Sequence, residues 1–200
     1  MDKKAETQWE KSNISYKNYR DYIDKKVNRY ELTLIDLLFI SNFKGGNATI
    51  NEPERTINTK LISYSIKLRD IENEFNGKTL AILTGEQLKN LVSRIIEICN
   101  LTCKNIETRI DGFSVSYLSA LLQAYFPTLI PILDRRVLIN LHIVSESDIN
   151  KQGQIKNIQQ FYKPLIEKIA EISRERGQTV REIDRNLFVI KIEKPLIDSK

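Results

Sequence analysis

The sequence predicts an all-α protein, and three features of the 200-residue chain support this prediction. Apolar residues recur at steps of three and four over several long stretches, which is the spacing of one helix face. Gly and Pro are scarce, at 7 and 5 residues, which disfavours the many tight turns of a β-sheet architecture. Hydrophobic residues make up 41% of the chain, which is typical of a globular protein. We therefore expect a single helical domain over residues 1–200.

The first part of the chain is expected to begin with a flexible segment. The first dozen residues are polar, and residues 1–15 are expected to be a flexible N-terminus. Residues 16–30 place tyrosine and aliphatic side chains at helical spacing, and we interpret this face as one that packs against the core. Thr33 is a candidate cap for a short apolar helix over residues 34–43.

Two longer helices are predicted next. The Gly pair at positions 45–46 indicates a loop, and a long amphipathic pattern follows Pro53. The helix after Pro53 is expected to end at Asn76-Gly77, since Gly favours the backbone conformation found after a helix. Thr84-Gly85-Glu86-Gln87 has the form of a capping box and starts a helix that extends to about Cys99.

The last part of the chain predicts a kinked helix, a short helix and an extended arm. Apolar residues recur from about Ile155 to Gly177, with Pro164 expected to bend the helix. Thr179-Val180-Arg181-Glu182 is a second capping box and begins a short helix through Leu187. Residues 188–196 are rich in β-branched side chains and are expected to form an extended arm.

Few side chains suit metal or nucleophilic chemistry. Cys99 and Cys103 have no third cysteine or nearby histidine to complete a zinc site, and two cysteines cannot bind a four-cysteine iron–sulfur cluster. The single histidine, His142, lies in an apolar stretch and is interpreted as a packed or surface residue. We therefore expect no metal and no cofactor.

The charge of the chain is compatible with a nucleic-acid partner. The net charge is +5 and the isoelectric point is near 9.1, although no run of Lys and Arg reaches the length of a basic tail. No apolar run approaches the roughly 20 residues that span a membrane. Residues 1–13 also lack the apolar core of a signal peptide. We expect a cytoplasmic protein without a membrane partner.

The segment over residues 104–141 contains the strongest functional signal. A short helix over residues 104–109 is expected to meet a turn at Gly112, and Ser114 is a candidate cap for the helix that follows. Such a turn can leave amide N–H groups at the start of the second helix free to bind a phosphate. A plain helical hairpin without a ligand fits the same spacing, so this pattern alone leaves both interpretations open.

Asp134 follows an apolar loop that contains two prolines, Pro127 and Pro131. Its position at a predicted helix start suits an N-cap, since a carboxylate there accepts amide hydrogen bonds and complements the helix dipole. An acid held between an apolar loop and a helix start can also face a cleft. Both interpretations remain open from the residues alone.

The segment thus has a glycine turn, a helix, an apolar loop with two prolines and an aspartate at a helix start. In this order of elements, the chain resembles the helix-hairpin-helix DNA glycosylase superfamily, and especially its small bacterial members. Residues 110–118 (IDGFSVSYL) stand in the place of the hairpin, and Asp134 stands in the place of the catalytic aspartate. Residues 181–188 (REIDRNLF) match a terminal motif of those members. The resemblance is good over residues 104–141 and loose over the first hundred residues. It implies a helix-hairpin-helix, glycosylase-like helical bundle.

Two positions depart from the pattern of this superfamily. Ser114 stands where a second hairpin glycine is usual, which predicts weaker phosphate binding. Ser116 stands where bifunctional members carry a catalytic lysine. The resemblance therefore implies cleavage without a Schiff base.

The resemblance implies a monofunctional DNA N-glycosylase that rotates a damaged or modified base out of the helix and excises it. Asp134 would stabilise the positive charge that develops on the sugar and orient the attacking water. Asn42, Phe43 and Lys44 are candidates for the far wall of the base pocket. The candidate DNA-binding residues are Gly112, Phe113, Ser114, Val115, Ser116, Tyr117, Lys104, Arg109, Arg135 and Arg136.

Two alternative functions remain from the sequence. The same fold can hold DNA or RNA without chemistry, which predicts salt-dependent binding and no base release. The helices can also form a scaffold that binds a partner protein, with the turn serving only as structure. The scaffold predicts that replacement of Gly112 leaves DNA affinity unchanged.

Overall fold

The computed structural model describes residues 2–45 and 50–192, and within these ranges it is built from helices and loops, which confirms the predicted all-α class. Short 3-10 helices lie at Leu80–Ile82, Glu146–Asp148 and Ile158–Phe161. The α-helices of the described ranges are α1 (Lys3–Lys25), α2 (Leu34–Phe43), α3 (Glu54–Phe75), α4 (Gly85–Asn100), α5 (Val115–Tyr125), α6 (Arg135–Asn140), α7 (Tyr162–Arg176) and α8 (Val180–Val189). Within the same ranges, no helix combines the length and hydrophobicity needed to cross a membrane.

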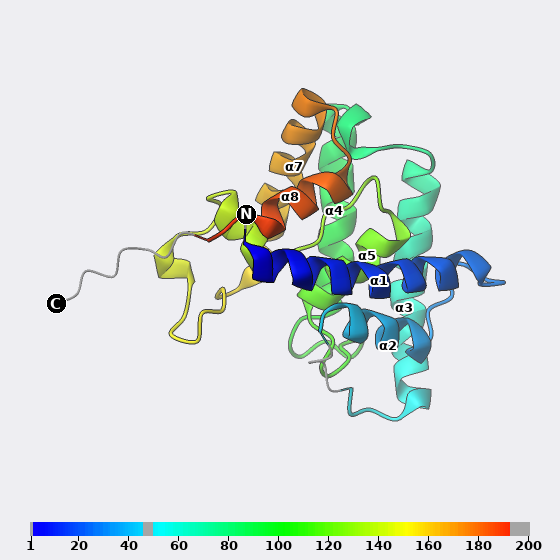
Figure 1. Ribbon diagram of the computed structural model, residues 1–200. Coiled ribbons are helices and arrows are strands. Elements are labelled where there is room, and N and C mark those ends of the chain that lie inside the picture. The colour runs from blue at the N-terminus through cyan, green and yellow to red at the C-terminus, as the bar shows by residue number, and fades with distance from the viewer. Residues whose placement is uncertain (1, 46–49, 193–200) are drawn as a thin grey trace.

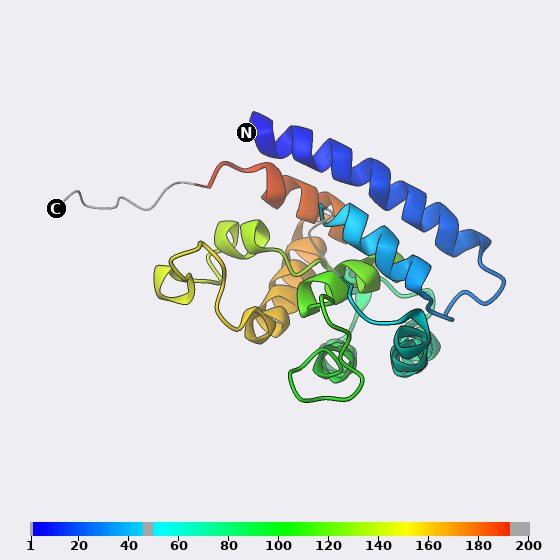
Figure 2. The same ribbon diagram turned by 90° about the horizontal axis from the view of Figure 1, so that it is seen from below.

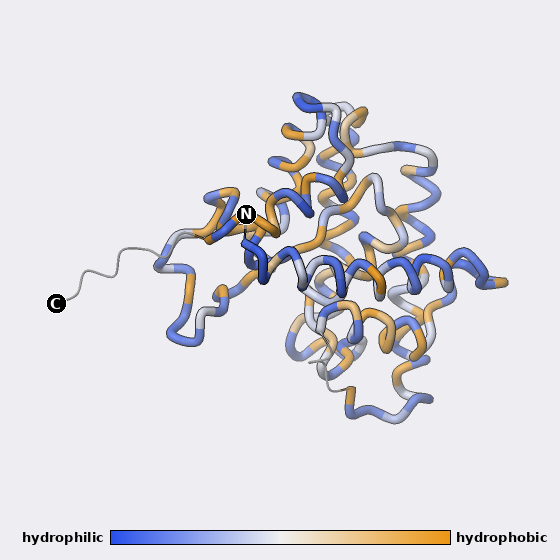
Figure 3. Tube along the Cα trace, viewed as in Figure 1, coloured by the Kyte–Doolittle hydropathy of each residue, from blue (hydrophilic) through white to orange (hydrophobic). Residues whose placement is uncertain are grey.

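Helix α1 crosses one side of the molecule and packs against α2, α5 and α8 (Figure 1). The view from below shows α1 on the outside, with α2 and α8 beneath it (Figure 2). Hydrophilic positions predominate along α1, as expected for a helix that buries one narrow face (Figure 3). Helices α3, α4 and α7 lie on the far side of the core, whose fully buried side chains include Leu61, Leu68, Leu121, Leu122 and Ile166.

The helix boundaries follow the local signals of the sequence at several positions. Thr84 begins α4 with a capping box, in which the Gln87 amide donates to Thr84 Oγ1 at 3.2 Å. Thr179 begins α8 in the same way. Gly77 and Gly177 follow α3 and α7 with φ of +70° and +63°, a conformation that glycine adopts without strain.

The prediction of a flexible segment over residues 1–15 was wrong. Residues 3–15 belong to α1, where Ala5 and Trp9 are buried against the rest of the protein. Asp2 begins the helix, since its carboxylate accepts amide hydrogen bonds from Lys4 and Ala5. Tertiary packing of a narrow apolar stripe, rather than overall hydrophobicity, makes this segment helical.

Two predictions for the C-terminal part were also wrong. Residues 158–161 form a 3-10 helix, so α7 begins only at Tyr162. Pro164 then falls in the first turn of α7, where its missing N–H is not needed and no kink is required. Phe188 and Val189 belong to α8 instead of an extended arm, and the predicted arm beyond Ile192 lies outside the described residues.

A buried ion pair joins α1, α2 and α5. Asp36 of α2 is fully buried, and Lys26 Nζ lies 2.9 Å from its Oδ2 atom. The hydroxyl groups of Tyr19 and Tyr125 each donate to Asp36 Oδ1 at 3.0 Å. These contacts hold α1 and α2 together, and both helices contribute residues to the cavity at Asp134 that is described below.

Candidate catalytic cavity and nucleic-acid interface

The turn before α5 differs from the predicted helix-hairpin-helix in its first arm. Residues 101–114 run through successive turns, so the predicted helix over residues 104–109 was wrong. Asn105 adopts a φ of +67° in the middle of this segment, which a continuous α-helix cannot accommodate. The glycine prediction fits the structure, because Gly112 has a φ of +81° at the turn.

At the start of α5, an exposed serine lies between two buried side chains. Ser114 is its N-cap residue, and the Ser114 side chain makes no capping hydrogen bond. The side chains of Phe113 and Val115 are buried in the core, and the Phe113 amide already donates to the Ile110 carbonyl at 3.1 Å. The predicted phosphate contacts are therefore reduced to the amides at the start of α5 itself.

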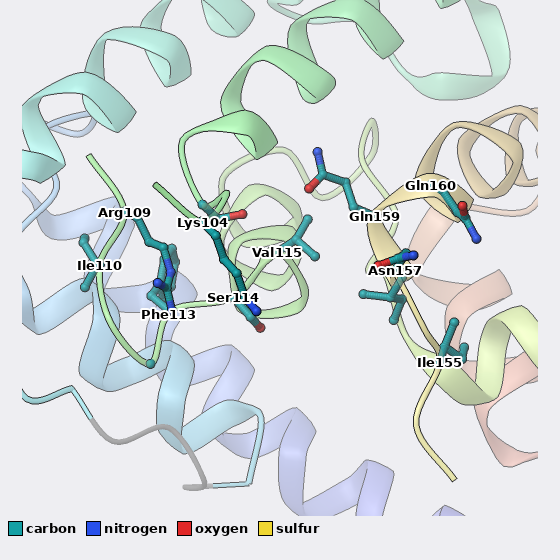
Figure 4. Close-up of a pocket in the computed structure, with 13 residues that line it drawn as sticks. Lys104, Arg109, Ile110, Phe113, Ser114, Val115, Ile155, Asn157, Gln159 and Gln160 are labelled. Atoms are coloured by element: carbon teal, nitrogen blue, oxygen red, sulfur yellow. The ribbon is translucent and has the colours of Figure 1, made fainter. Parts of the chain in front are cut away.

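A groove of about 710 Å³ lies beside this turn (Figure 4). Lys104 and Arg109 extend side by side from the 101–114 segment, and residues 155–160 form the opposite wall. Arg109 Nη2 lies 3.3 Å from the carboxylate of Asp111. Acidic side chains therefore offset part of the positive charge at the turn.

A second acid increases this offset. Glu52 Oε1 accepts the Asp111 amide hydrogen bond at 2.6 Å, and the same side chain pairs with Lys60. The candidate basic residues at the turn, Lys104 and Arg109, thus share it with acidic side chains. Because Lys104 is exposed, it is the basic residue here that is best placed to reach a phosphate.

The two arginines after Asp134 have different surroundings. Arg136 Nε donates to the Phe188 carbonyl at 2.8 Å, and its Nη2 lies 2.9 Å from Asp2 Oδ2. Arg136 thus ties the start of α1 to the end of α8, and these partners occupy its Nε and Nη2 atoms, which leaves fewer donors for the predicted DNA contact. Arg135 is exposed and donates to the Gly153 carbonyl.

The loop that precedes Asp134 is attached to α5 and α7. Ser119 Oγ accepts the Leu133 amide hydrogen bond at 2.9 Å, and Ser116 Oγ donates to the Leu133 carbonyl at 3.1 Å. The Tyr162 hydroxyl donates to the Pro131 carbonyl at 3.0 Å. These bonds satisfy buried backbone groups and hold the start of α6 in place.

Asp134 serves both as a helix cap and as a wall of a cavity. Its Oδ1 atom accepts the Arg136 amide hydrogen bond at 2.8 Å, as an N-cap does. Its Oδ2 atom lies 3.4 Å from Lys44 Nζ. The side chain is 23% exposed and lines a cavity of about 90 Å³. Asp134 is therefore both the N-cap of α6 and an acid that faces a cavity, so the two interpretations from the sequence are compatible.

Four distant segments converge on this cavity, from α1, the end of α2, the start of α6, and α8. Phe43 and Lys44 line it, as predicted for its far wall. Asn42 does not, because its side chain is exposed and donates to Ser15 Oγ at 3.0 Å. The apolar lining residues are Trp9, Phe43, Ile132, Val137 and Phe188.

Two polar residues of α8 also line the cavity, and the sequence analysis did not select them. The Arg181 guanidinium lies 4.0 Å from the Trp9 ring and 4.3 Å from the Tyr16 ring, measured to the ring centroids. Asp184 is 1% exposed, and its Oδ2 atom accepts the Ile132 amide hydrogen bond at 3.5 Å. A usable signal existed, because Asp184 falls among the apolar positions of an amphipathic helix, where an acid is unusual.

Arg181 and Asp184 retain unused hydrogen-bonding groups within the described structure. Arg181 Nη2 donates to Asn13 at 3.1 Å, but its Nε and Nη1 atoms are buried without a partner. The Oδ1 atom of Asp184 is likewise buried without a partner. Buried polar groups are usually satisfied, so these atoms indicate a place for a polar ligand or water.

Burial raises the pKa of Asp184 to about 7, from an ordinary value of 3.8. The nearby charge of Arg181 and the Ile132 amide act in the opposite direction, and the negative charge of Asp134 adds to the increase. Burial also lowers the pKa of Arg181. The cavity thus contains an acid that exchanges its proton near neutral pH.

This pKa predicts a dependence of stability on pH. The folded state binds the Asp184 proton more tightly than the unfolded state. The protonated Asp184 therefore makes its full contribution to the free energy of unfolding below pH 3.8, and this contribution is lost as the pH rises through 7. A shift of this size corresponds to at most about 4 kcal/mol of unfolding free energy. In urea unfolding at a series of pH values, Asp184→Asn should remove this decline relative to the wild type.

The matched control is Asp21→Asn, which makes the same change at an exposed position of α1. Its stability curve should run parallel to that of the wild type. A parallel curve for Asp184→Asn as well would show that Asp184 ionises in the folded protein as it does in the unfolded chain.

Comparisons with known proteins identify no relative. No family model, curated protein or solved structure matches the chain. Among the residues that the structure describes, no three His, Cys, Asp or Glu side chains gather as metal ligands would. The candidate functional features of the described chain are therefore the cavity at Asp134 and the turn before α5.

Proposed function

We propose that this protein binds DNA and acts as a monofunctional N-glycosylase on a damaged or modified base. The observation that supports this most directly is the position of Asp134, whose carboxylate borders a cavity lined in part by aromatic rings. Apolar and aromatic walls suit the faces of a planar base that has left the DNA stack. The fold would then be a glycosylase-like helical bundle with a modified hairpin.

The proposed chemistry depends on the charge of Asp134. Breakage of the bond between sugar and base builds positive charge on the sugar, which a nearby carboxylate stabilises. The Asp134 carboxylate lies 3.4 Å from Lys44 Nζ and accepts the Arg136 amide hydrogen bond at 2.8 Å, so its position at the cavity is fixed by two contacts. Asp134 then orients a water molecule for attack on the sugar carbon.

A Schiff-base mechanism is not part of the proposal. Ser116, at the position of the lysine of bifunctional enzymes, is bonded to the Leu133 carbonyl. Lys44 lies at the same cavity, but its Nζ atom is paired with Asp134 at 3.4 Å, and the proposal assigns it no covalent role. Borohydride added during the reaction should trap no covalent adduct between the protein and DNA.

DNA would be held by the backbone at the start of α5 and by exposed basic side chains near it. Amides at a helix start bind phosphates through their N–H groups and the helix dipole. Lys104 and Arg135 are exposed and can reach phosphates. Because Asp111 and Glu52 lie at the same turn, we expect modest affinity with a clear dependence on salt.

A base-release assay tests the proposal. The wild-type protein is incubated with single-stranded and duplex DNAs that carry deaminated, oxidised and alkylated bases, and free base and abasic sites are measured. Release from at least one substrate, without borohydride trapping, is the expected result. DNA binding is measured in parallel as a function of salt concentration.

The mixed charges at the turn favour a second candidate, a nucleic-acid-binding module without chemistry. Salt-dependent binding without release of any base would support that module and reject the glycosylase. Absence of both binding and release would reject both candidates in favour of the scaffold.

A further inference from the structure

The cavity holds two carboxylates in opposite environments. Asp134 is partly exposed, pairs with Lys44 and accepts an amide hydrogen bond. Asp184 is 1% exposed, and its Oδ1 atom has no hydrogen-bond partner in the described part of the chain. Two acids whose environments differ in this way commonly divide the roles of proton donor and charged stabiliser in the cleavage of glycosidic bonds.

We propose that Asp184 is the general acid of the reaction, which protonates the departing base while Asp134 stabilises the sugar. This inference rests on the proposed glycosylase function. Asp184 lines the cavity and its buried Oδ1 atom has no hydrogen-bond partner in the described part of the chain, so a base seated against this side chain can accept its proton. Asp184 would thus be a catalytic residue that the sequence analysis did not identify.

The proposed step balances in atoms and electrons. The bond between the sugar carbon and the base nitrogen breaks, and its electron pair leaves with the base. The Asp184 proton passes to a ring nitrogen or carbonyl oxygen of the base, which leaves neutral. Water adds its oxygen to the sugar carbon and loses one proton to Asp134. Asp134 then releases this proton to solvent, and solvent returns one proton to Asp184, which restores both groups.

The surroundings of Asp184 suit both of its protonation states. Burial favours the neutral acid near pH 7, and the guanidinium of Arg181 on the same helix stabilises the carboxylate that remains after proton transfer. A general acid is most effective when its pKa lies near the working pH. The titratable and charged groups that interact with Asp184 from the surrounding elements are Arg181, Asp134, Lys44, Tyr16 and Tyr162.

The test compares bases that need a proton with bases that do not. A neutral base leaves readily only when it is protonated, whereas an N7-alkylated purine is already cationic and leaves as a neutral molecule. Asp184→Asn should lower the release of a neutral base by about 10²- to 10⁴-fold, the usual contribution of a positioned acid. Release of the cationic base should remain largely unchanged.

Each outcome decides the inference. Equal losses on both substrates would assign Asp184 a merely structural role, and retained release of the neutral base would remove it from the reaction. Wild-type release of the cationic base alone would overturn the general acid and leave the glycosylase intact. No release of either base by the wild type would reject the proposed function itself.

A measurement on the wild type covers the case in which Asp184→Asn fails to fold. Release of the neutral base should decline as the pH rises through about 7, because only the protonated acid is active. Release of the cationic base should show no such decline. Matching pH profiles for the two substrates would overturn the proposal. In the comparison of variants, Asp21→Asn is the folded control for Asp184→Asn.

Discussion

Asp134→Asn is expected to lower base release by about 10³-fold or more, the scale of losing a group that stabilises charge in the transition state. The amide cannot neutralise the positive charge on the sugar as a carboxylate does. Folding should be retained, because asparagine is also a good N-cap residue and can accept the Arg136 amide hydrogen bond. Single-turnover rates, measured alongside DNA affinity, separate loss of chemistry from loss of binding.

The matched control is Asp2→Asn, which makes the same change at another helix N-cap. Asp2 caps α1 through the amides of Lys4 and Ala5, and it does not line the cavity. Its rate of base release should stay close to that of the wild type. Retained release in Asp134→Asn would exclude Asp134 from catalysis.

Lys26→Met is expected to reduce the free energy of unfolding by about 3–5 kcal/mol, which is the usual cost of leaving a buried charge without its partner. Asp36 is fully buried, and Lys26 Nζ is its cationic partner at 2.9 Å. The hydroxyl groups of Tyr19 and Tyr125 donate hydrogen bonds to Asp36 but supply no positive charge. Urea unfolding at neutral pH measures the difference.

Lys25→Met is the control for this change, since Lys25 is exposed and directly precedes Lys26 in the chain. It should alter stability by less than about 0.5 kcal/mol. The double variant Lys26→Met/Asp36→Asn should lose less than the sum of its single variants, because the buried charge is removed together with its partner. Equal effects of Lys25→Met and Lys26→Met would show that the buried pair contributes no net stability.

The sequence by itself determined the local features of this protein. Thr84 and Thr179 start helices because a capping box needs only residues three apart, and Gly77 and Gly177 end helices because glycine adopts positive φ without strain. Gly112 occupies the turn for the same reason. Asp134 could also be selected, since a short polar residue after a proline-containing loop is typical of an N-cap.

Where local patterns were ambiguous, tertiary contacts decided the structure. Residues 3–15 looked flexible because they are polar, yet the burial of Trp9 against α8 makes them helical. Residues 104–109 looked helical, but the chain turns at Asn105 instead. Helical propensity alone is a weak guide in such short or polar segments.

Only the tertiary structure brought the parts of the cavity together. Trp9, Lys44, Asp134 and Asp184 are far apart in the chain, and their proximity depends on how α1, α2, α6 and α8 pack. The pKa of Asp184 likewise follows from desolvation, which arises when the helices close around it. Local spacing identifies a helix and its cap, but an acid becomes a candidate catalyst only through neighbours that the whole fold supplies.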